Sequence, residues 1–287
     1  DLHSFPTRRS SDLWSCRLFL ALFTVSSARG YQVVIDGRQP LAEQMRPQKL
    51  DEVIGQSHLL GEGELLRQIV RRAEPVSLIL WGPPGTGKTT LARIIAREVN
   101  AEFVELSAVT SGKKDVEKVI EHARQNWNLG LRTILFVDEI HRFNKAQQDA
   151  FLPHVESGLI TLIGATTENP SFEVITPLLS RTRVLVLQQL TKDEIILVLK
   201  RALKVLKQTK RVSPKALDYL AELADGDARV ALGNLELALS FGGKVTPEVV
   251  KAAAQRRLPG YDKKGDAHYD VISAAPKIGR ASCRERV

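Results

Sequence analysis

The residues most suited to chemistry lie between Gly82 and Thr89, where the chain reads G-P-P-G-T-G-K-T. They fit the spacing G-x-x-x-x-G-K-[ST], in which the glycines let backbone N–H groups point at phosphates. Lys88 can then reach the β- and γ-phosphates of a nucleotide, and the Thr89 hydroxyl can hold Mg²⁺. The spacing predicts a nucleotide phosphate site, and a glycine- and proline-rich turn without a ligand is the alternative.

The flanking residues predict the elements that hold this loop. The apolar run from Val76 to Trp81 is typical of a buried parallel strand. After the loop, apolar residues recur at helical spacing at Leu91, Ile94, Ile95 and Val99. A strand, a glycine loop and a helix in this order is the context in which the motif binds phosphate.

A second group of chemical residues follows another apolar run, Thr133–Val137, which ends in Asp138 and Glu139. Ligands of open α/β sheets lie at the carboxyl ends of parallel strands. Asp138 would hold Mg²⁺, directly or through water, and Glu139 would orient and polarise the attacking water. Charged residues often end strands, so it is the pairing with the phosphate loop that favours the catalytic interpretation.

The remaining pattern predicts two domains. Further strands are expected at 103–106, 159–165 and 184–187, and helices at 65–73, 115–125 and 144–156, the last distorted at Pro153; residues 40–56 are expected to be loop and turn. Alternating strands and helices imply a parallel sheet with helices on both faces. Thereafter Thr191 with Glu194, Ser213-Pro214, Asp227 and Thr246-Pro247 each open a predicted helix, giving a small all-helical domain.

The two ends of the chain are expected to be foreign to the fold. One DNA segment that encodes Leu2–Asp12 encodes I-G-R-A-S-C-R-E-R-V on its opposite strand, and residues 278–287 carry that sequence. We therefore assign residues 1–13 and 278–287 to a sequencing adapter. The segment 14–39 stays uncertain: Leu18–Val25 resembles the apolar region of a signal peptide, but read-through upstream of the true start is the favoured explanation.

Composition limits the function classes. The formal net charge of +8 is compatible with a nucleic-acid partner without establishing one. The only cysteines are Cys16 and Cys283, so no disulfide or cysteine metal site is expected in the core. No apolar run is long enough to span a bilayer. Metal catalysis by His58, His141 or His154 is not favoured, because no ligand cluster accompanies them.

Five stretches together resemble the AAA+ ATPases, and within them the family of replication-associated recombination protein A and the Werner-helicase-interacting protein. They are W-G-P-P-G-T-G-K-T-T, F-V-D-E-I-H-R-F-N-K-A-Q-Q-D, L-I-G-A-T-T-E-N-P-S-F, L-L-S-R and D-G-D-A-R. The resemblance covers about residues 40–274, and the run from His141 to Phe172 separates this family from clamp-loader subunits and branch-migration motors. Ile175-Thr176-Pro177 departs from the family pattern.

The resemblance implies the fold and the domain limits. The expected fold is α/β, a P-loop AAA+ parallel sheet flanked by helices and followed by a helical lid. The α/β nucleotide-binding domain would span residues 40–188, the lid 189–257, and the start of a truncated C-terminal region 258–277.

The resemblance also assigns residues. Thr167 resembles the sensor that contacts the γ-phosphate or water, Arg181 the finger that reaches the ATP of a neighbouring subunit, and Arg229 the lid sensor. A surface arginine and a helix-terminal arginine are the structural alternatives for the last two. The nucleotide-binding set is Gly82, Pro83, Pro84, Gly85, Thr86, Gly87, Lys88, Thr89, Thr90, Ile54, Gly55 and Arg229; the metal set is Thr89 and Asp138.

The implied function is a DNA-dependent, Mg²⁺-dependent ATP hydrolase at stalled or gapped replication forks. The implied partners are DNA with single-stranded ends, forks or gaps, single-strand-binding and replisome proteins, and further copies of the chain, with no membrane. The expected location is the cytoplasm of a bacterium, or the nucleus if the source is eukaryotic. The alternatives are an ATP-gated scaffold and a clamp-loader-like subunit with weak turnover. A protein-remodelling motor is disfavoured, because S-G-K-K (111–114) lacks an aromatic pore loop; Lys113 and Lys114 are DNA-contact candidates or a solvated charge pair.

Overall fold

The computed structural model describes residues 24–26, 32–34 and 39–256. The predicted adapter ends, the segment 258–277 and most of the apolar run Leu18–Val25 lie outside these residues. Ahead of the main fold, two short strands, β1 (Thr24–Ser26) and β2 (Gln32–Val34), pair antiparallel.

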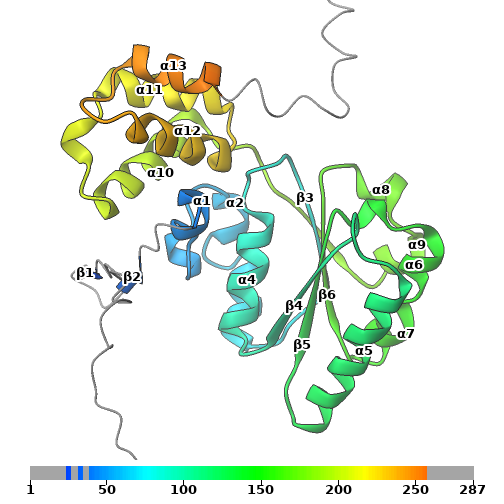
Figure 1. The fold of residues 1–287 in the computed structure, drawn as a ribbon. Coiled ribbons are helices and arrows are strands. Elements are labelled where there is room, and N and C mark those ends of the chain that lie inside the picture. Colours follow the sequence, from blue (N-terminus) through cyan, green and yellow to red (C-terminus); the bar gives the residue numbers. More distant parts are fainter. Residues whose placement is uncertain (1–23, 27–31, 35–38, 257–287) are drawn as a thin grey trace, which may run out of the picture.

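The centre of the fold is a five-stranded sheet with the strand order β4-β5-β6-β3-β7 (Figure 1). All its pairings are parallel. The strands are β3 (Leu78–Trp81), β4 (Glu102–Ser107), β5 (Thr133–Asp138), β6 (Thr161–Thr166) and β7 (Arg183–Val186). The predicted strands and their parallel arrangement are thus confirmed. Since β3 lies between β6 and β7, the loop that follows it opens at the carboxyl edge of the sheet, beside the end of β6, where open α/β sheets bind ligands.

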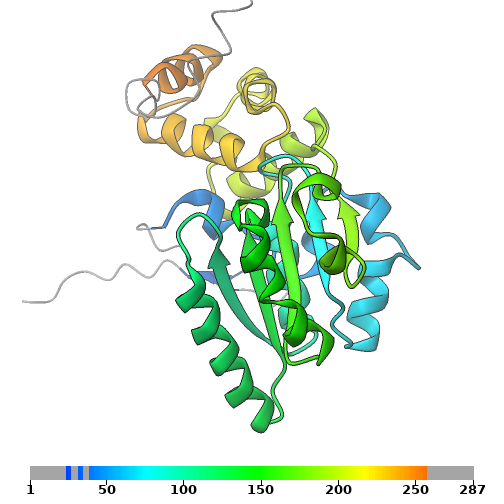
Figure 2. The same ribbon diagram turned by 90° about the vertical axis from the view of Figure 1, so that its right-hand side faces the viewer.

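Helices cover both faces of this sheet, as predicted (Figure 2). Because successive strand residues point to opposite faces, Ile134 and Phe136 pack with α3 (Leu65–Arg72) and α4 (Lys88–Glu98), whereas Leu135 packs with α5 (Lys113–Asn128). These three strand residues are fully buried. Packing against both apolar clusters fixes the position of β5 in the sheet, and thereby the position of Asp138 and Glu139 at its end.

One predicted helix is two helices. The segment 144–156 forms α6 (Lys145–Asp149) and α7 (Leu152–Glu156), and the break precedes Pro153. Phe151 is fully buried at this break, and its carbonyl accepts from the N–H groups of His154 and Val155 at 3.1 and 3.0 Å. Pro153 therefore lies in the first turn of α7, where a missing N–H costs no helical hydrogen bond. The prediction of one helix distorted at Pro153 was wrong in this detail.

The segment 40–56 also contains more structure than the predicted loop and turn. It forms α1 (Leu41–Gln44) and a 3₁₀ turn, η1 (Leu50–Glu52), because Leu41 and Leu50 are buried in different cores. Other single-turn helices are too short for a periodic pattern to reveal. They are α2 (Ser57–Leu60), η2 (Ile140–Arg142), α8 (Pro170–Glu173) and α9 (Thr176–Leu179).

The predicted helical domain consists of α10 (Lys192–Val205), η3 (Thr209–Arg211), α11 (Pro214–Ala224), α12 (Ala228–Ser240) and α13 (Pro247–Arg256). Its expected start signals are present. Thr191 Oγ1 accepts from the Glu194 N–H at 3.3 Å, Glu194 Oε2 accepts from the Thr191 N–H at 2.8 Å, and Ser213 Oγ caps α11. Among the described helices none is long and apolar enough to cross a membrane.

Candidate nucleotide-binding site

The phosphate loop joins β3 to α4, and Lys88 is the first residue of that helix. Gly87 precedes it with a φ of +97°, a left-handed conformation that suits glycine. The buried Lys88 ammonium donates to the carbonyl oxygens of Gly82 and Pro83 at 2.6 and 2.9 Å. Burial lowers the pKa of Lys88, and the nearby carboxylates of Glu139 and Asp138 act in the opposite direction. A cation held among carbonyls and carboxylates at a helix N-terminus is well placed for phosphate.

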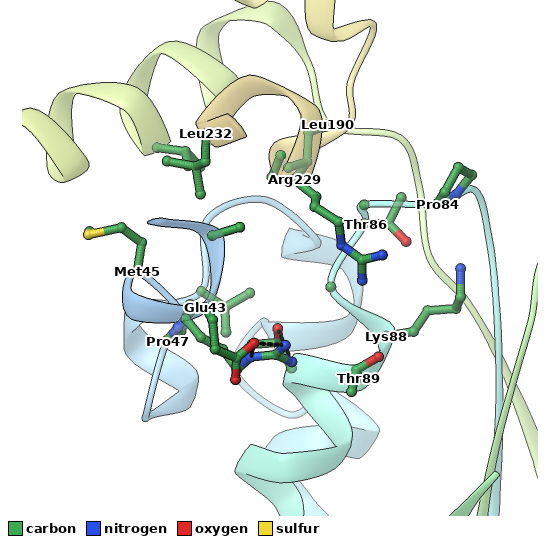
Figure 3. A pocket seen from close by; sticks show the side chains of 18 of the residues that line it. Glu43, Met45, Pro47, Pro84, Thr86, Lys88, Thr89, Leu190, Arg229 and Leu232 are labelled. Carbon is green, nitrogen blue, oxygen red and sulfur yellow. Dashed lines mark hydrogen bonds and ion pairs between the residues drawn. The ribbon is translucent and has the colours of Figure 1, made fainter. Parts of the chain in front are cut away.

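The loop also touches the lid. Gly85 has a φ of +70°, and a Cβ at this position would lie 2.0 Å from Asp227 Oδ1. The same Asp227 oxygen caps α12, accepting from the N–H groups of Arg229 and Val230 at 2.7 and 3.0 Å. Glycine is therefore required at this contact, which brings the N-terminus of α12 against the loop. From there the Arg229 side chain extends toward Thr86 and Lys88 (Figure 3).

The acidic residues lie at the carboxyl end of β5. Asp138 is the last residue of that strand, and Glu139 follows with a left-handed φ of +53°. On the adjacent strand β6, the residue after the end is Thr167, whose Oγ1 donates to Glu139 Oε2 at 3.5 Å. Neighbouring parallel strands thus bring Asp138, Glu139 and Thr167 to one edge, beside the loop that follows β3.

A cavity of about 400 Å³ collects these groups between the sheet edge and the lid. Twelve of the residues predicted for the site line it: Ile54, Pro84, Gly85, Thr86, Gly87, Lys88, Thr89, Thr90, Asp138, Glu139, Thr167 and Arg229. Of the rest, Gly82 and Pro83 contribute the carbonyls that hold Lys88, and Gly55 packs against Leu190.

Arg181 lies elsewhere. It follows α9, outside the lining of this cavity. Its Nη2 is 2.5 Å from Glu156 Oε1, and its Nη1 donates to the Pro177 carbonyl at 2.8 Å. Arg181 is thus held on the surface beside α7, in a place where it does not act on its own chain's cavity.

Sequence reasoning missed the far end of the cavity. Five apolar residues line it there, Met45, Pro47, Val53, Val198 and Leu232, together with the polar residues Glu43, Arg46, Glu52 and Arg201. They come from residues 43–53 and from lid helices that lie far apart in the sequence, so no local motif marks them. The apolar residues at this end, with Leu232 on the lid side and Pro47 on the opposite side (Figure 3), suit the base of a nucleotide.

The candidate metal ligands fit Mg²⁺. Thr89 and Asp138 offer a hydroxyl and a carboxylate at the same cavity as Lys88. In the described part of the chain no three His, Cys, Asp or Glu residues gather into a metal-binding group. Mg²⁺ binds in such surroundings through one or two protein oxygens, with water and substrate phosphates completing its octahedron.

Both predicted DNA-contact candidates, Lys113 and Lys114, lie at the start of α5, and Lys113 forms a surface ion pair. Lys113 begins α5, and its Nζ lies 3.9 Å from Glu117 Oε1. Both side chains are well exposed, so the solvated-pair interpretation of this lysine is the one that the geometry favours.

Comparison with known proteins gives the same picture. Residues 78–190 match the model of the ATPase family associated with various cellular activities (AAA), and residues 206–278 match the AAA C-terminal domain. Replication-associated recombination protein A of Haemophilus influenzae is 50% identical over 254 residues, 85% of this chain and 57% of that protein. ATPase WRNIP1 of Dictyostelium discoideum is 45% identical over 269 residues, 85% of this chain and 31% of that protein.

A solved structure shares the fold. The Thermotoga maritima RuvB Holliday junction branch migration motor superposes with a TM-score of 0.61 and 29% identity, over 74% of this chain and 72% of that one. The chain spans little more than half the length of its bacterial relatives. By its phosphate loop, its paired acidic residues, its lid and these matches, the chain belongs to the AAA+ ATPases and, within them, to the family of replication-associated recombination protein A.

Proposed function

We propose that this chain is the ATP-hydrolysing core of a protein that acts on DNA at stalled or gapped replication forks, in recombination and repair. The observation that carries the proposal is the single cavity lined by the phosphate loop, Asp138, Glu139, Thr167 and Arg229. The relatives support the proposal: replication-associated recombination protein A by the process in its name, and ATPase WRNIP1 by the activity in its name.

The residues divide the work as follows. The loop N–H groups and Lys88 bind the phosphates, and Thr89 with Asp138 hold Mg²⁺. When bound, Mg²⁺ neutralises charge that develops on the phosphate oxygens. Glu139 orients the attacking water and accepts its proton, with Thr167 beside it. Burial lowers the pKa of Lys88, and the facing carboxylates of Glu139 and Asp138 oppose this and favour its charged form.

Full turnover requires a second copy of the chain. Arg181 is outside its own cavity and bound to Glu156 on the surface, so it would be delivered to the ATP of a neighbour. An arginine supplied in trans stabilises the transition-state charge and has a large effect on the rate. Hydrolysis would then alter the subunit interface and, through Arg229, the angle of the lid.

The same observation supports a second candidate, a scaffold that binds ATP and recruits replication partners with slow turnover. An isolated copy has every group needed to hold the nucleotide but lacks the arginine of a neighbour. In this alternative, bound ATP closes the lid, and the closed lid controls the binding of the replication partners.

The test is steady-state ATP turnover by the chain alone, with duplex DNA, and with DNA that carries single-stranded ends. Glu139→Gln is the blank, and Glu121→Gln is the matched control because Glu121 pairs with Arg124 on α5, outside the cavity. DNA-stimulated turnover that Glu139→Gln abolishes and Glu121→Gln leaves intact supports the fork ATPase. ATP binding with turnover no higher than the blank, at concentrations where the chain assembles, favours the scaffold.

A further inference from the structure

A buried histidine lies directly behind the proposed catalytic glutamate. His141 belongs to the 3₁₀ turn η2, two residues after Glu139, and its side chain is only 4% exposed. The residues that line the cavity include Asp138 and Glu139 but not His141. The function proposed above therefore gives this ring no task.

Its two nitrogens face different partners. Nδ1 lies 3.0 Å from Thr166 Oγ1 and 3.3 Å from Glu139 Oε2. Nε2 lies 3.3 Å from Glu168 Oε1, on a side chain that is half exposed. The ring thus connects the end of β5, where Glu139 lies, to the end of β6.

The hydrogen bonds of Thr166 decide which nitrogen carries a hydrogen. The Thr166 hydroxyl is fully buried; it donates to the Glu168 carbonyl at 3.1 Å and accepts from the Glu168 N–H at 3.0 Å. A hydroxyl has one hydrogen and two lone pairs, so only an acceptor position is left for His141. Nδ1 therefore carries a hydrogen, and this N–H is shared between Thr166 and Glu139.

The Nδ1–H of His141 holds one of the two carboxylate oxygens of Glu139. In the described part of the chain the polar contacts of its carboxylate, from Thr167 Oγ1 at 3.5 Å and from His141 Nδ1, fall on Oε2. Oε1 is left to take a water. The backbone of Glu139 is in the left-handed region, with its carbonyl accepting from the Arg142 N–H at 2.8 Å. The backbone strain and the held oxygen together fix the direction of the carboxylate.

We propose that His141 is the positioning residue of Glu139: its Nδ1–H, oriented by Thr166, holds Oε2 so that Oε1 faces the attacking water. The inference rests on the proposed function, because it requires Glu139 to take the proton of that water. His141 itself touches neither nucleotide nor water. Its contribution is to the rate of the chemical step and not to ATP affinity, since the phosphates are bound by the loop and Lys88.

Three substitutions of His141 separate this role from a packing role. His141→Asn keeps a donor near the place of Nδ1, His141→Gln keeps one near the place of Nε2, and His141→Leu fills the space without a donor. We expect Asn to retain the wild-type kcat within about threefold and Gln and Leu to lose about tenfold or more, all with an unchanged Kd for ATP. His122→Leu is the control, because His122 is on α5 and pairs with Glu102; its kcat should equal that of the wild type.

Two kinetic outcomes would overturn the proposal. The first is a folded His141→Leu variant with the wild-type kcat. The second is an Asn variant as slow as Leu with a matching loss of thermal stability, which would make the ring a packing residue. In the Glu139→Gln background, His141→Leu should cause no further loss, because the partner through which it acts is already changed.

A measurement without turnover tests the contact itself. Side-chain ¹H–¹⁵N spectra of the six histidines report their tautomers, and the signal lost in His141→Asn identifies the ring. We expect a hydrogen on Nδ1, with a shift that changes in Glu139→Gln; a ring that carries its hydrogen on Nε2 alone would overturn the proposal. A wild-type turnover no higher than that of Glu139→Gln contradicts the proposed function instead, and the spectrum then decides on the His141–Glu139 contact alone.

Discussion

Arg201 of the lid holds Glu52 of the nucleotide-binding domain. Its Nη1 donates to the Glu52 carbonyl at 2.6 Å, and its Nη2 lies 3.1 Å from Glu52 Oε2. Both residues line the cavity beside Val53 and Val198, the apolar end that suits the base. The pair therefore closes the lid on the same end of the cavity in which the base would lie.

Loss of this pair should weaken ATP binding. The side chains are 35% and 23% exposed, so we expect Arg201→Met to cost up to about 1 kcal/mol, which is the upper range for a partly solvated ion pair. That corresponds to an increase of up to about fivefold in the Kd for ATP. A titration with a fluorescent ATP analogue measures it.

Lys192→Met is the matched control for Arg201→Met. Lys192 and Glu222 form a similar pair, but both belong to the lid and lie outside the lining of the cavity. This variant should bind the analogue as the wild type does. Equal affinities in both variants would mean that the Arg201–Glu52 pair has no influence on the bound nucleotide.

The same pair predicts a pH dependence. Burial favours a higher pKa for Glu52, but hydrogen bonds from Gln48 and Arg201 and the charge of Arg201 prevail, so its pKa is lowered from 4.5. The ionised carboxylate thus stabilises the fold above the unfolded pKa, and this stabilisation is lost as pH falls through the lower folded pKa. Melting temperatures of the wild type and Glu52→Gln should differ at about pH 7 and converge as the pH falls below about 4. A gap that stays constant would contradict the assignment.

The parts of the site that the sequence could predict are those with a local cause. The phosphate loop has its glycines and Lys88 within eight residues, and the helix start at Thr191 and Glu194 depends on two side chains three positions apart. Asp138 and Glu139 were predictable because they directly follow the apolar run Thr133–Val137, and the end of that run marks the end of the strand. In each case the interaction that fixes the structure lies inside the motif.

The base end of the cavity has no such cause. Met45 precedes the phosphate loop by some forty residues in the sequence and Leu232 follows it by well over a hundred, and they meet only when α12 packs on α1. Leu41 and Met45 are buried in the core of the lid, while Leu50 is buried with the sheet. The segment 41–50 therefore joins the two domains, and its helix α1 depends on tertiary packing and not on its own propensity.

Gly85 should tolerate no side chain. Its φ is +70°, and a Cβ would overlap the Asp227 carboxylate that caps α12. We expect Gly85→Ala to lower the free energy of unfolding by about 1–3 kcal/mol and to raise the Kd for ATP about tenfold or more, because the loop and the lid must separate. Thermal melts and the same analogue titration measure both effects.

Gly112 provides the comparison for Gly85. It precedes α5 with a φ of −110°, and no atom lies within 4 Å of the place where its Cβ would be. Gly112→Ala should change the free energy of unfolding by no more than about 0.5 kcal/mol. If Gly85→Ala behaved in the same way, the contact between the phosphate loop and Asp227 would be too loose to link the lid to the nucleotide.

Arg181 should matter for turnover and not for binding. Because it lies outside its own cavity, Arg181→Ala should leave the Kd for ATP unchanged and lower kcat by about 10³ or more, the effect of an arginine supplied in trans. Arg183→Ala, two positions further on at the exposed start of β7, is the matched control and should be neutral. An Arg181→Ala variant with normal turnover would remove the case for a shared site.

Mixing two inactive variants tests the shared site directly. A Lys88→Ala copy has lost its own cavity but keeps Arg181, and an Arg181→Ala copy keeps the cavity but has lost the arginine. At an interface where the intact cavity of the Arg181→Ala copy faces the Lys88→Ala copy, that cavity receives the arginine of its neighbour. Turnover should therefore return in part, and the turnover per Arg181→Ala copy should rise as the Lys88→Ala copy is added in excess. An arginine that acted within its own chain would give no recovery at any ratio.

The ion pair between Arg181 and Glu156 predicts a further effect. Glu156→Gln frees the Arg181 guanidinium and should make its delivery to the neighbour easier. We therefore expect this variant to raise turnover at limiting chain concentration.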